Sequence, residues 1–270
     1  MSTYYNENNP HAARWLRRLI QEGRIPPGDV DDRSIVDVDP ADVRAYKHAH
    51  FFAGIGGWAA AGRLAGWPDD IPLWTGSCPC QPWSQAGEGG GADDERHLWP
   101  EWFRLISAVR PPIVMGEQVT TAITRGWFDE VASNLEDEGY AWRAAIVPAC
   151  AIGAPHRRDR LWFVAHARGE RLSGAERLGG EKQDASTADL WKAATERDRG
   201  APWRDHRLAV GSDGISRLVK PGVRLLAHGI PERVGVLSGF GNAIVPQVGA
   251  IMMETFLACV GDFNLRCVSE

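Results

Sequence analysis

Apolar positions follow two different periods along this chain, and the two kinds of segment alternate. Within residues 10–21 they recur at the three- and four-residue spacing of one helix face, and a proline opens the segment, as a first helical turn allows. Short apolar runs at residues 4–5, 51–52, 71–75, 113–119, 146–148 and 161–165 predict strands, whereas residues 58–64, 99–109 and 248–260 predict further helices. Strands alternating with helices are typical of an α/β fold.

Composition narrows the class of protein. A chain of 270 residues buries a sizeable core and is expected to form one large domain and a smaller one. It has no apolar run of the roughly 18 residues that a membrane span needs, and no charged-then-apolar N-terminus. We therefore expect a cytoplasmic protein that is neither exported nor membrane-bound. The five cysteines are sparse and irregularly spaced, which favours reduced thiols over disulfides and gives no metal site.

The distribution of charge changes the meaning of the net charge. The formal net charge is −5, which by itself argues against a partner rich in phosphate. Residues 156–224, however, carry an excess of Lys and Arg over Asp and Glu, while the rest of the chain is acidic. A basic segment on an acidic body fits a protein that grips phosphate on one face, and it also fits a solvated loop region of mixed charge.

The segment at residues 76–84 carries the most specific chemical signal. It holds a Pro-Cys-Gln-Pro run at residues 79–82, followed by Trp and Ser, and its prolines and glycine fix a non-helical backbone path. The run resembles the nucleophile loop of the DNA cytosine-5 methyltransferases. The resemblance implies that Cys80 attacks a cytosine ring and that Pro79 lines the cofactor pocket. By itself the segment also fits a surface loop with two cysteines, Cys78 and Cys80.

A glycine-rich turn follows the predicted strand at residues 51–52. A strand, a glycine turn and a helix form the layout in which backbone N–H groups face a ligand, and glycine allows a close approach. The string Phe-Ala-Gly-Ile-Gly-Gly at residues 52–57 resembles the same family's motif for S-adenosyl-L-methionine. The resemblance assigns these residues to the cofactor: Phe52 (against adenine), Gly54, Ile55, Gly56 and Gly57. A purely structural strand–helix corner is the alternative.

In the family that this chain resembles, two further strands lie between the glycine turn and the cysteine loop and supply the contacts for ribose and adenine. Residues 58–75 allow only one helix and one strand, so half of the expected cofactor pocket is missing there. The N-terminal segment supplies it. An aromatic strand ending in Asn-Glu resembles the family's second motif and implies that Glu7 and Asn8 lie on the ribose side. Residues 33–39 resemble the third motif and place Ser34, where the family usually has Asp, and Ile35 on the adenine side.

The motifs then run second, third, first, fourth, which predicts a circularly permuted chain. We expect a Rossmann-like, mostly parallel sheet with a permuted strand order. The alternative is that residues 1–47 are an unrelated helical leader. A right-handed crossover from the glycine-motif strand to the cysteine-loop strand would move the intervening helix to the opposite face from its usual place. The sequence leaves open how the chain resolves this conflict.

Three further side chains complete the expected catalytic set. Glu117 ends a buried strand in a Glu-Gln-Val run that resembles the family's Glu-Asn-Val motif, which implies contact with cytosine N3 and its amine. Arg158 and Arg160 match the family's Pro-Gln-x-Arg-x-Arg motif, with His156 in place of Gln, and imply an arginine fork for cytosine O2 and phosphate. The structural alternatives are a solvated strand end and a generic basic loop.

The remaining segments define the expected domains. Residues 86–98 resemble the family's loop that closes over the target base, although a plain linker would look similar. Residues 1–165 are the expected catalytic domain and residues 166–234 the target-recognition region, where no base code is assignable. Residues 235–270 would return to the catalytic domain and bring Asn242, in a Gly-Asn-Ala motif, to the cofactor, although Asn242 also suits a helix N-cap.

The sequence thus predicts a small, phage-like DNA (cytosine-5-)-methyltransferase, with restriction–modification as the family's usual setting. It would use S-adenosyl-L-methionine on double-stranded DNA and act as a monomer without an obligate protein partner. Three alternatives remain: an enzyme acting on RNA, a related enzyme that transfers another one-carbon unit, and an inactive DNA-binding homologue.

Overall fold

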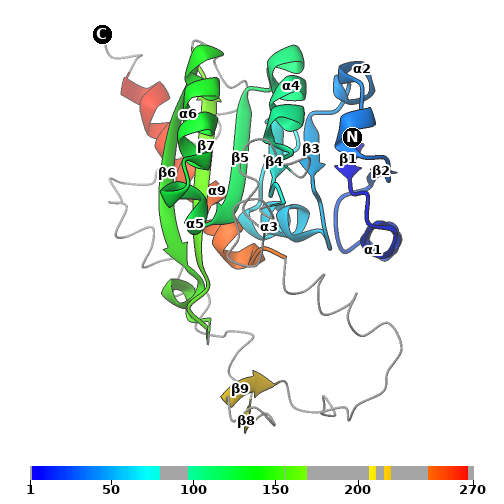
Figure 1. The fold of residues 1–270 in the computed structure, drawn as a ribbon, viewed down its shortest axis with the longest axis vertical. Helices are drawn as coiled ribbons and strands as arrows, with labels where there is room; N and C mark the ends of the chain where they lie inside the picture. Colours follow the sequence, from blue (N-terminus) through cyan, green and yellow to red (C-terminus); the bar gives the residue numbers. More distant parts are fainter. Residues whose placement is uncertain are drawn as a thin grey trace.

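The computed structural model describes residues 2–79, 97–154, 156–168, 207–210, 216–219 and 243–266. Seven strands form one sheet in the order β2-β1-β3-β4-β5-β7-β6 (Figure 1). The five strands from β2 to β5 are parallel, and β7 and β6 complete the sheet in antiparallel pairs. The strands are β1 Thr3–Asn6, β2 Gly28–Asp31, β3 His48–Phe51, β4 Leu73–Gly76, β5 Ile113–Val119, β6 Tyr140–Pro148 and β7 Asp159–Ala167.

Helices connect and cover these strands. The α-helices are α1 Pro10–Gln21, α2 Pro40–Val43, α3 Gly57–Ala65, α4 Trp99–Val109, α5 Thr121–Thr124, α6 Trp127–Asp137 and α9 Pro246–Arg266, with 3-10 turns η1 Ile35–Asp37 and η3 Ala149–Ile152. A separate antiparallel hairpin joins β8 Arg207–Val210 to β9 Ser216–Val219. Within the described ranges, none of the helices combines the length and the apolar character of a membrane span.

The N-terminal strand lies inside the sheet. Strand β1 pairs in parallel with β2 on one side and with β3 on the other, and Tyr4 and Tyr5 lie opposite Ala49 and His50 of β3. Both tyrosines are buried, so the first residues contribute to the core. Residues 1–47 are therefore no independent leader, and the permuted strand order expected from the motifs is confirmed.

Alternate residues of each strand face two separate parts of the core. Phe51, Trp74 and Val114 pack with α2, α4 and α6 on one face of the sheet. Leu73 and Met115 pack with α3 and α9 on the other face, and Tyr5 packs there with α1. In Figure 1, α4 and α6 accordingly lie in front of the sheet and α9 passes behind it. The fold is thus a three-layer α/β sandwich.

Helix α3 resolves the topological conflict posed by the permutation. The connections β3–α3–β4 and β4–α4–β5 step in the same direction across the sheet, yet α3 and α4 cover opposite faces. The two crossovers therefore have opposite hands. The crossovers through α1 and α2 agree with that of α4, and nearly all such connections are right-handed. The β3–α3–β4 crossover is the left-handed exception, which keeps α3 between α1 and α9.

Candidate functional site

The residues singled out in four motifs follow one line across the sheet. Asn6 of β1 lies opposite Phe51 of β3, and Phe51 lies opposite Gly76 of β4. Gly76 in turn lies opposite Gly116 of β5. The four strands are parallel, so the next residue of each reaches the same edge of the sheet. These next residues are Glu7, Phe52, Ser77 and Glu117.

The glycine turn leaves β3 through left-handed backbone. Phe52 has φ 50°, Gly54 has φ 55° and Gly56 has φ 86°. Glycine adopts such angles readily, whereas a phenylalanine there is a strained exception. The half-buried Phe52 ring packs edge-on against Trp102 with ring centroids 6.3 Å apart. The turn is therefore held in one shape by packing from the α4 face.

Glu7 connects the end of β1 to this turn. Its Oε2 accepts the backbone N–H of Gly54 at 2.7 Å, and its Oε1 accepts the backbone N–H of Asn9 at 2.8 Å. Asn9 in turn caps α1 by accepting the N–H groups of His11 and Ala12. Glu7 is half-buried and Asn8 is exposed. A carboxylate has further lone pairs, so both bonds leave capacity for a ligand hydroxyl.

The three glycines of the turn serve different purposes. A Cβ on Gly54 would meet only the Phe52 carbonyl oxygen, at 3.9 Å, so this position faces open space. A Cβ on Gly56 would press on Leu16 of α1, and a Cβ on Gly57 would lie 2.6 Å from Ile244 Cγ1. Only Gly54 leaves room for a ligand; Gly57 is required for the close approach of the segment that leads into α9.

The predicted adenine side shows two distinct environments. Ser34 is half-buried, and its hydroxyl caps the 3-10 turn η1 by accepting the Val36 N–H. Ile35 is only 2 % exposed and belongs to the core, which leaves it little surface for a ligand. Ile55, in the glycine turn, is half-buried. Their roles toward a cofactor stay predictions.

The backbone before the predicted nucleophile is fixed from β5. Gln118, which is 2 % exposed, donates its amide Nε2–H to the Cys78 carbonyl oxygen at 3.2 Å, and its Oε1 accepts the Val119 N–H at 2.9 Å. Cys78 is buried and Pro79 is exposed. Cys80, Asn242 and the predicted closing loop at residues 86–98 lie outside the described residues, except for His97 and Leu98 at the end of that loop.

Glu117 is a buried carboxyl in a charged environment. It is 6 % exposed, and Arg160 Nε lies 2.9 Å from its Oε1. Burial raises the pKa of Glu117 above its usual value, while the charges of Arg160 and Arg158 and a hydrogen bond with the Ser77 hydroxyl act in the opposite direction. A carboxyl with a raised pKa beside two arginines is a candidate for proton exchange with a ligand.

The two predicted arginines have different partners. Arg160 pairs with Glu117, whereas Arg158 donates from Nη2 to the Ala243 carbonyl oxygen at 2.7 Å. Arg158 has φ 38°, a strained angle for a residue with a side chain. Burial and the neighbouring charge of Arg160 lower its pKa. The Arg160 guanidinium has five N–H donors, more than its contacts with Glu117 and the Asp159 carbonyl oxygen need.

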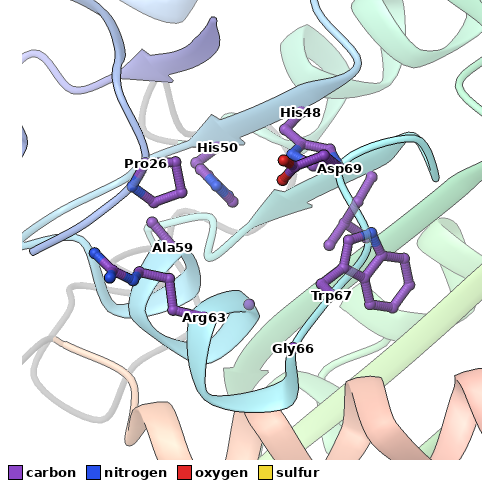
Figure 2. Close-up of a pocket in the computed structure, with 10 residues that line it drawn as sticks. Pro26, His48, His50, Ala59, Arg63, Gly66, Trp67 and Asp69 are labelled. Atoms are coloured by element: carbon purple, nitrogen blue, oxygen red, sulfur yellow. The ribbon is translucent and has the colours of Figure 1, made fainter. Parts of the chain in front are cut away.

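A cavity of about 390 Å³ lies between α3 and the strands β3 and β4, away from this edge (Figure 2). It reaches His48 and Leu73, the first residues of β3 and β4, whereas the motifs follow the last residues of these strands. His50 lines it and shares a 2.7 Å hydrogen bond between Nδ1 and Thr75 Oγ1. Burial lowers the pKa of His50 to about 3, so its ring is neutral. The cavity is separate from the candidate site. In the described part of the chain, no group of three or more His, Cys, Asp or Glu side chains is arranged so that it could hold a metal ion.

Comparison with known proteins decides the family. A family model described as C-5 cytosine-specific DNA methylase matches residues 61–201, just over half of the sequence. This chain belongs to the C-5 cytosine-specific DNA methylases. The resemblance inferred from the motifs is thereby confirmed.

Curated proteins similar to this chain are named type II methyltransferases. The type II methyltransferase M.NaeI of Lentzea aerocolonigenes is 31% identical over 201 residues, which are 70% of this chain and 42% of the relative. The type II methyltransferase M.NgoMIV of Neisseria gonorrhoeae is 35% identical over 105 residues, which are 36% of this chain and 32% of the relative. The chain thus covers less than half the length of these relatives.

A solved structure shares the fold of this chain. The Entamoeba histolytica methyltransferase EhMeth superposes with a TM-score of 0.52 over 93% of this chain and 88% of that chain, at 13% identity. At this identity the match concerns the fold alone, and it confirms the predicted α/β methyltransferase fold.

Two residues of the candidate site were not identified by the sequence motifs. The Nε1–H of Trp58, in α3, donates to Ser77 Oγ at 3.0 Å, and Ser77 is the hydroxyl next to Glu117. Ser77 stands just before the Pro-Cys-Gln-Pro run, so the sequence motif could have pointed to it. Trp58 gave none, because only the packing of α3 on the sheet brings it to the site.

Proposed function

We propose that this protein is a DNA (cytosine-5-)-methyltransferase that transfers a methyl group from S-adenosyl-L-methionine to C5 of cytosine in double-stranded DNA. The observation that carries the proposal is Glu117. It is a buried carboxyl with a raised pKa, paired with Arg160, and it lies one strand away from the loop that leads to Cys80. A type II methyltransferase name among the relatives supports the same activity.

Glu117 activates the cytosine ring in this mechanism. A protonated or hydrogen-bonding carboxyl at N3 withdraws electrons from the ring and makes C6 electrophilic. Burial favours the protonated form of Glu117. Arg160 binds one of the two carboxyl oxygens, so the protein and not water fixes the orientation of the carboxyl group. Gln118 follows in β5 and fixes the Cys78 carbonyl, which sets the path of the cysteine loop.

Cys80 is the proposed nucleophile. Its thiolate forms a bond to C6, and the electron pair of the C5–C6 double bond moves into the ring. C5 would then accept the methyl group as the bond from the methyl carbon to the donor's sulfonium sulfur breaks, which would leave the donor as a neutral thioether. Loss of the C5 proton to a base and cleavage of the C6–sulfur bond restore the double bond and the free cysteine. The step needs no oxidant or reductant.

The residues present fit the proposed cofactor. Gly54 faces open space where a Cβ would meet no close neighbour, and Glu7 places a carboxylate beside it, from the neighbouring strand. Phe52 offers a half-buried ring at the same turn. S-adenosyl-L-methionine, when bound, supplies an electrophilic methyl group. Glu7 would hold the ribose hydroxyls and Phe52 the adenine, with Asn8, Ile55, Ser34, Ile35, Pro79 and Asn242 as further predicted contacts.

The DNA must present an extrahelical base. Taking a cytosine out of a duplex costs a few kcal/mol, least at mismatched or single-stranded sites. We assign residues 1–165 to catalysis, residues 166–234 to target recognition and residues 235–270 to a segment that returns to the catalytic domain. Arg158 supports the last assignment, since it binds the carbonyl of Ala243 just before α9.

Bisulfite sequencing of DNA from cells that produce the protein tests the activity. Conversion-resistant cytosines should appear with the natural protein. With Glu117→Gln, turnover should fall by about 100-fold or more, the usual scale for a general acid–base group. Glu138→Gln is the matched control, because Glu138 also pairs with an arginine, Arg110, but at the opposite end of β5 from Glu117, and its change should leave methylation intact.

Three outcomes would favour other activities. Methylated RNA with unmodified DNA would indicate an RNA substrate. A different mass on C5, seen by nucleoside mass spectrometry, would indicate another one-carbon unit. DNA binding by the purified protein without any modification would indicate an inactive homologue.

A further inference from the structure

Trp58 lies on the face of the sheet that α3 covers, and it contacts two residues beside Glu117, Trp162 and Ser77. It is 3 % exposed, and its ring lies edge-on to Trp162 with centroids 5.3 Å apart. Trp162 of β7 lies opposite Glu117 of β5 in the strand register. On the other side, the Trp58 indole Nε1 lies 3.0 Å from Ser77 Oγ at the end of β4. Helix α3 is thus in contact with two of the groups that surround Glu117.

The chemistry of these groups fixes the direction of the hydrogen bonds. An indole N–H is a donor only, so Ser77 Oγ must accept from Trp58. The Ser77 proton then stays available for Glu117, with which the hydroxyl is hydrogen-bonded. An ionised carboxylate is an acceptor only. The hydrogen bonds therefore run in one direction: Trp58 donates to Ser77, and Ser77 donates to the Glu117 carboxylate.

We propose that Trp58 and Ser77 are positioning residues that, together with Arg160, stabilise the ionised form of Glu117 and hold its carboxylate in one orientation at the end of β5. The groups that act on Glu117 through their charge are Arg160 and Arg158, while β4 contributes the Ser77 hydroxyl and α3 the Trp58 N–H. Burial favours the neutral carboxyl, and these donors favour the carboxylate. Their opposition keeps both forms accessible during a catalytic cycle.

The left-handed crossover explains why this support exists in this chain. Because α3 lies on the face shared with α9, its first turn passes behind β4 and β5. Trp58 is the second residue of α3, immediately after the glycine turn. The same few residues therefore shape the predicted cofactor turn and support the predicted catalytic carboxyl. The inference deepens the proposed function, since it concerns how Glu117 is prepared for its step.

Titration of the Glu117 carboxyl in the full-length free protein tests the proposal directly. With carbon-13 in the glutamate side chains, Glu117 is assigned by the signal that Glu117→Gln removes. In Ser77→Ala the midpoint should rise by about one to two pH units, the worth of one hydrogen bond to a charged group. Ser77→Thr keeps the hydroxyl and should restore the natural midpoint. Trp58→Phe should show part of the rise.

Trp67→Phe is the matched control for Trp58→Phe. It removes the indole N–H that donates to the Ile71 carbonyl oxygen, away from Glu117, and should leave the midpoint unchanged. An unchanged or lower midpoint in Ser77→Ala would overturn the proposal. So would equal shifts in the two tryptophan variants. If Ser77→Ala does not fold, Trp58→Phe against Trp67→Phe decides.

The readout is independent of activity. The titration needs neither DNA nor cofactor. A protein that modifies no cytosine would refute the proposed function, whereas the titration would still test the role of Ser77 and Trp58. In an active enzyme the alkaline limb of the pH–rate profile should move to higher pH in Ser77→Ala, in step with the titration. A fall in rate without any shift of the profile would mean that Ser77 has a structural role only.

Discussion

Replacing Glu7 with alanine perturbs the contact that joins the N-terminal strand to the glycine turn. The carboxylate accepts one partly buried N–H from Gly54 and one exposed N–H from Asn9. A hydrogen bond to a charged group contributes about 1.5–3 kcal/mol, and the exposed bond contributes least because water replaces it. We therefore expect Glu7→Ala to lower the free energy of unfolding by about 1.5 kcal/mol.

The effect on cofactor binding adds to this loss. If Glu7 also holds the ribose, one further charged hydrogen bond disappears, and the affinity for S-adenosyl-L-methionine should fall about 10-fold or more, since each 1.4 kcal/mol is a factor of ten. Glu7→Gln keeps one oxygen acceptor, so its affinity and stability should lie between those of the natural protein and those of Glu7→Ala. Calorimetric titration gives the affinity, and urea unfolding gives the stability.

Glu22→Ala provides the matched control in the same N-terminal segment. Glu22 forms an exposed ion pair with Arg18 at 2.7 Å, and such pairs contribute little. Its removal should leave both measurements near those of the natural protein. Natural affinity and natural stability in Glu7→Ala would refute the reasoning, because the strand end would then have no part in the pocket.

Three further outcomes are expected. Cys80→Ala should abolish covalent trapping on DNA that contains 5-fluorocytosine while cofactor binding persists, and an adduct with this variant would contradict its role as nucleophile. Gly57→Ala should destabilise the fold by about 1–3 kcal/mol in urea unfolding, since its Cβ would overlap Ile244, whereas Gly62→Ala, with no neighbour nearer than 3.9 Å, should be neutral or stabilising. For Glu117 the pKa is raised by burial, so its ionisation opposes folding. The natural protein should lose stability relative to Glu117→Gln as pH rises from the ordinary pKa of a glutamate to the raised native one, and the loss should level off above that. Urea unfolding of both proteins over a series of pH values measures the difference.

Much of the fold and of the candidate site was readable from local sequence. The apolar spacing at residues 10–21 predicted α1, and Leu16 is fully buried on its inner face. The Asn-Glu pair at the end of β1 predicted a neighbour for the glycine turn, and Glu7 does bond to Gly54. Such features are predictable because the period of one element, and the common edge of parallel strands, follow from backbone geometry.

Other local inferences needed correction by packing. The short apolar run at residues 146–148 is only the end of β6, which begins at Tyr140, because the strand alternates between a buried and an exposed face at the edge of the sheet. The glycines of the turn look equivalent in the sequence, yet Gly57 makes room for Ile244 and only Gly54 faces open space. What a glycine is for depends on the atoms that approach it, and these come from distant parts of the chain.

The sequence by itself determined the family, the alternation of strands and helices, and the permuted order of the motifs. Only the tertiary structure decided the face on which α3 lies, the burial of Glu117 and its connection through Ser77 to Trp58. The hand of a crossover is set by which surfaces a helix can bury, here those of α1 and α9, and α9 is about two hundred residues further along the chain. Contacts over such separations leave no period in the local sequence, so they become visible only when the chain is packed.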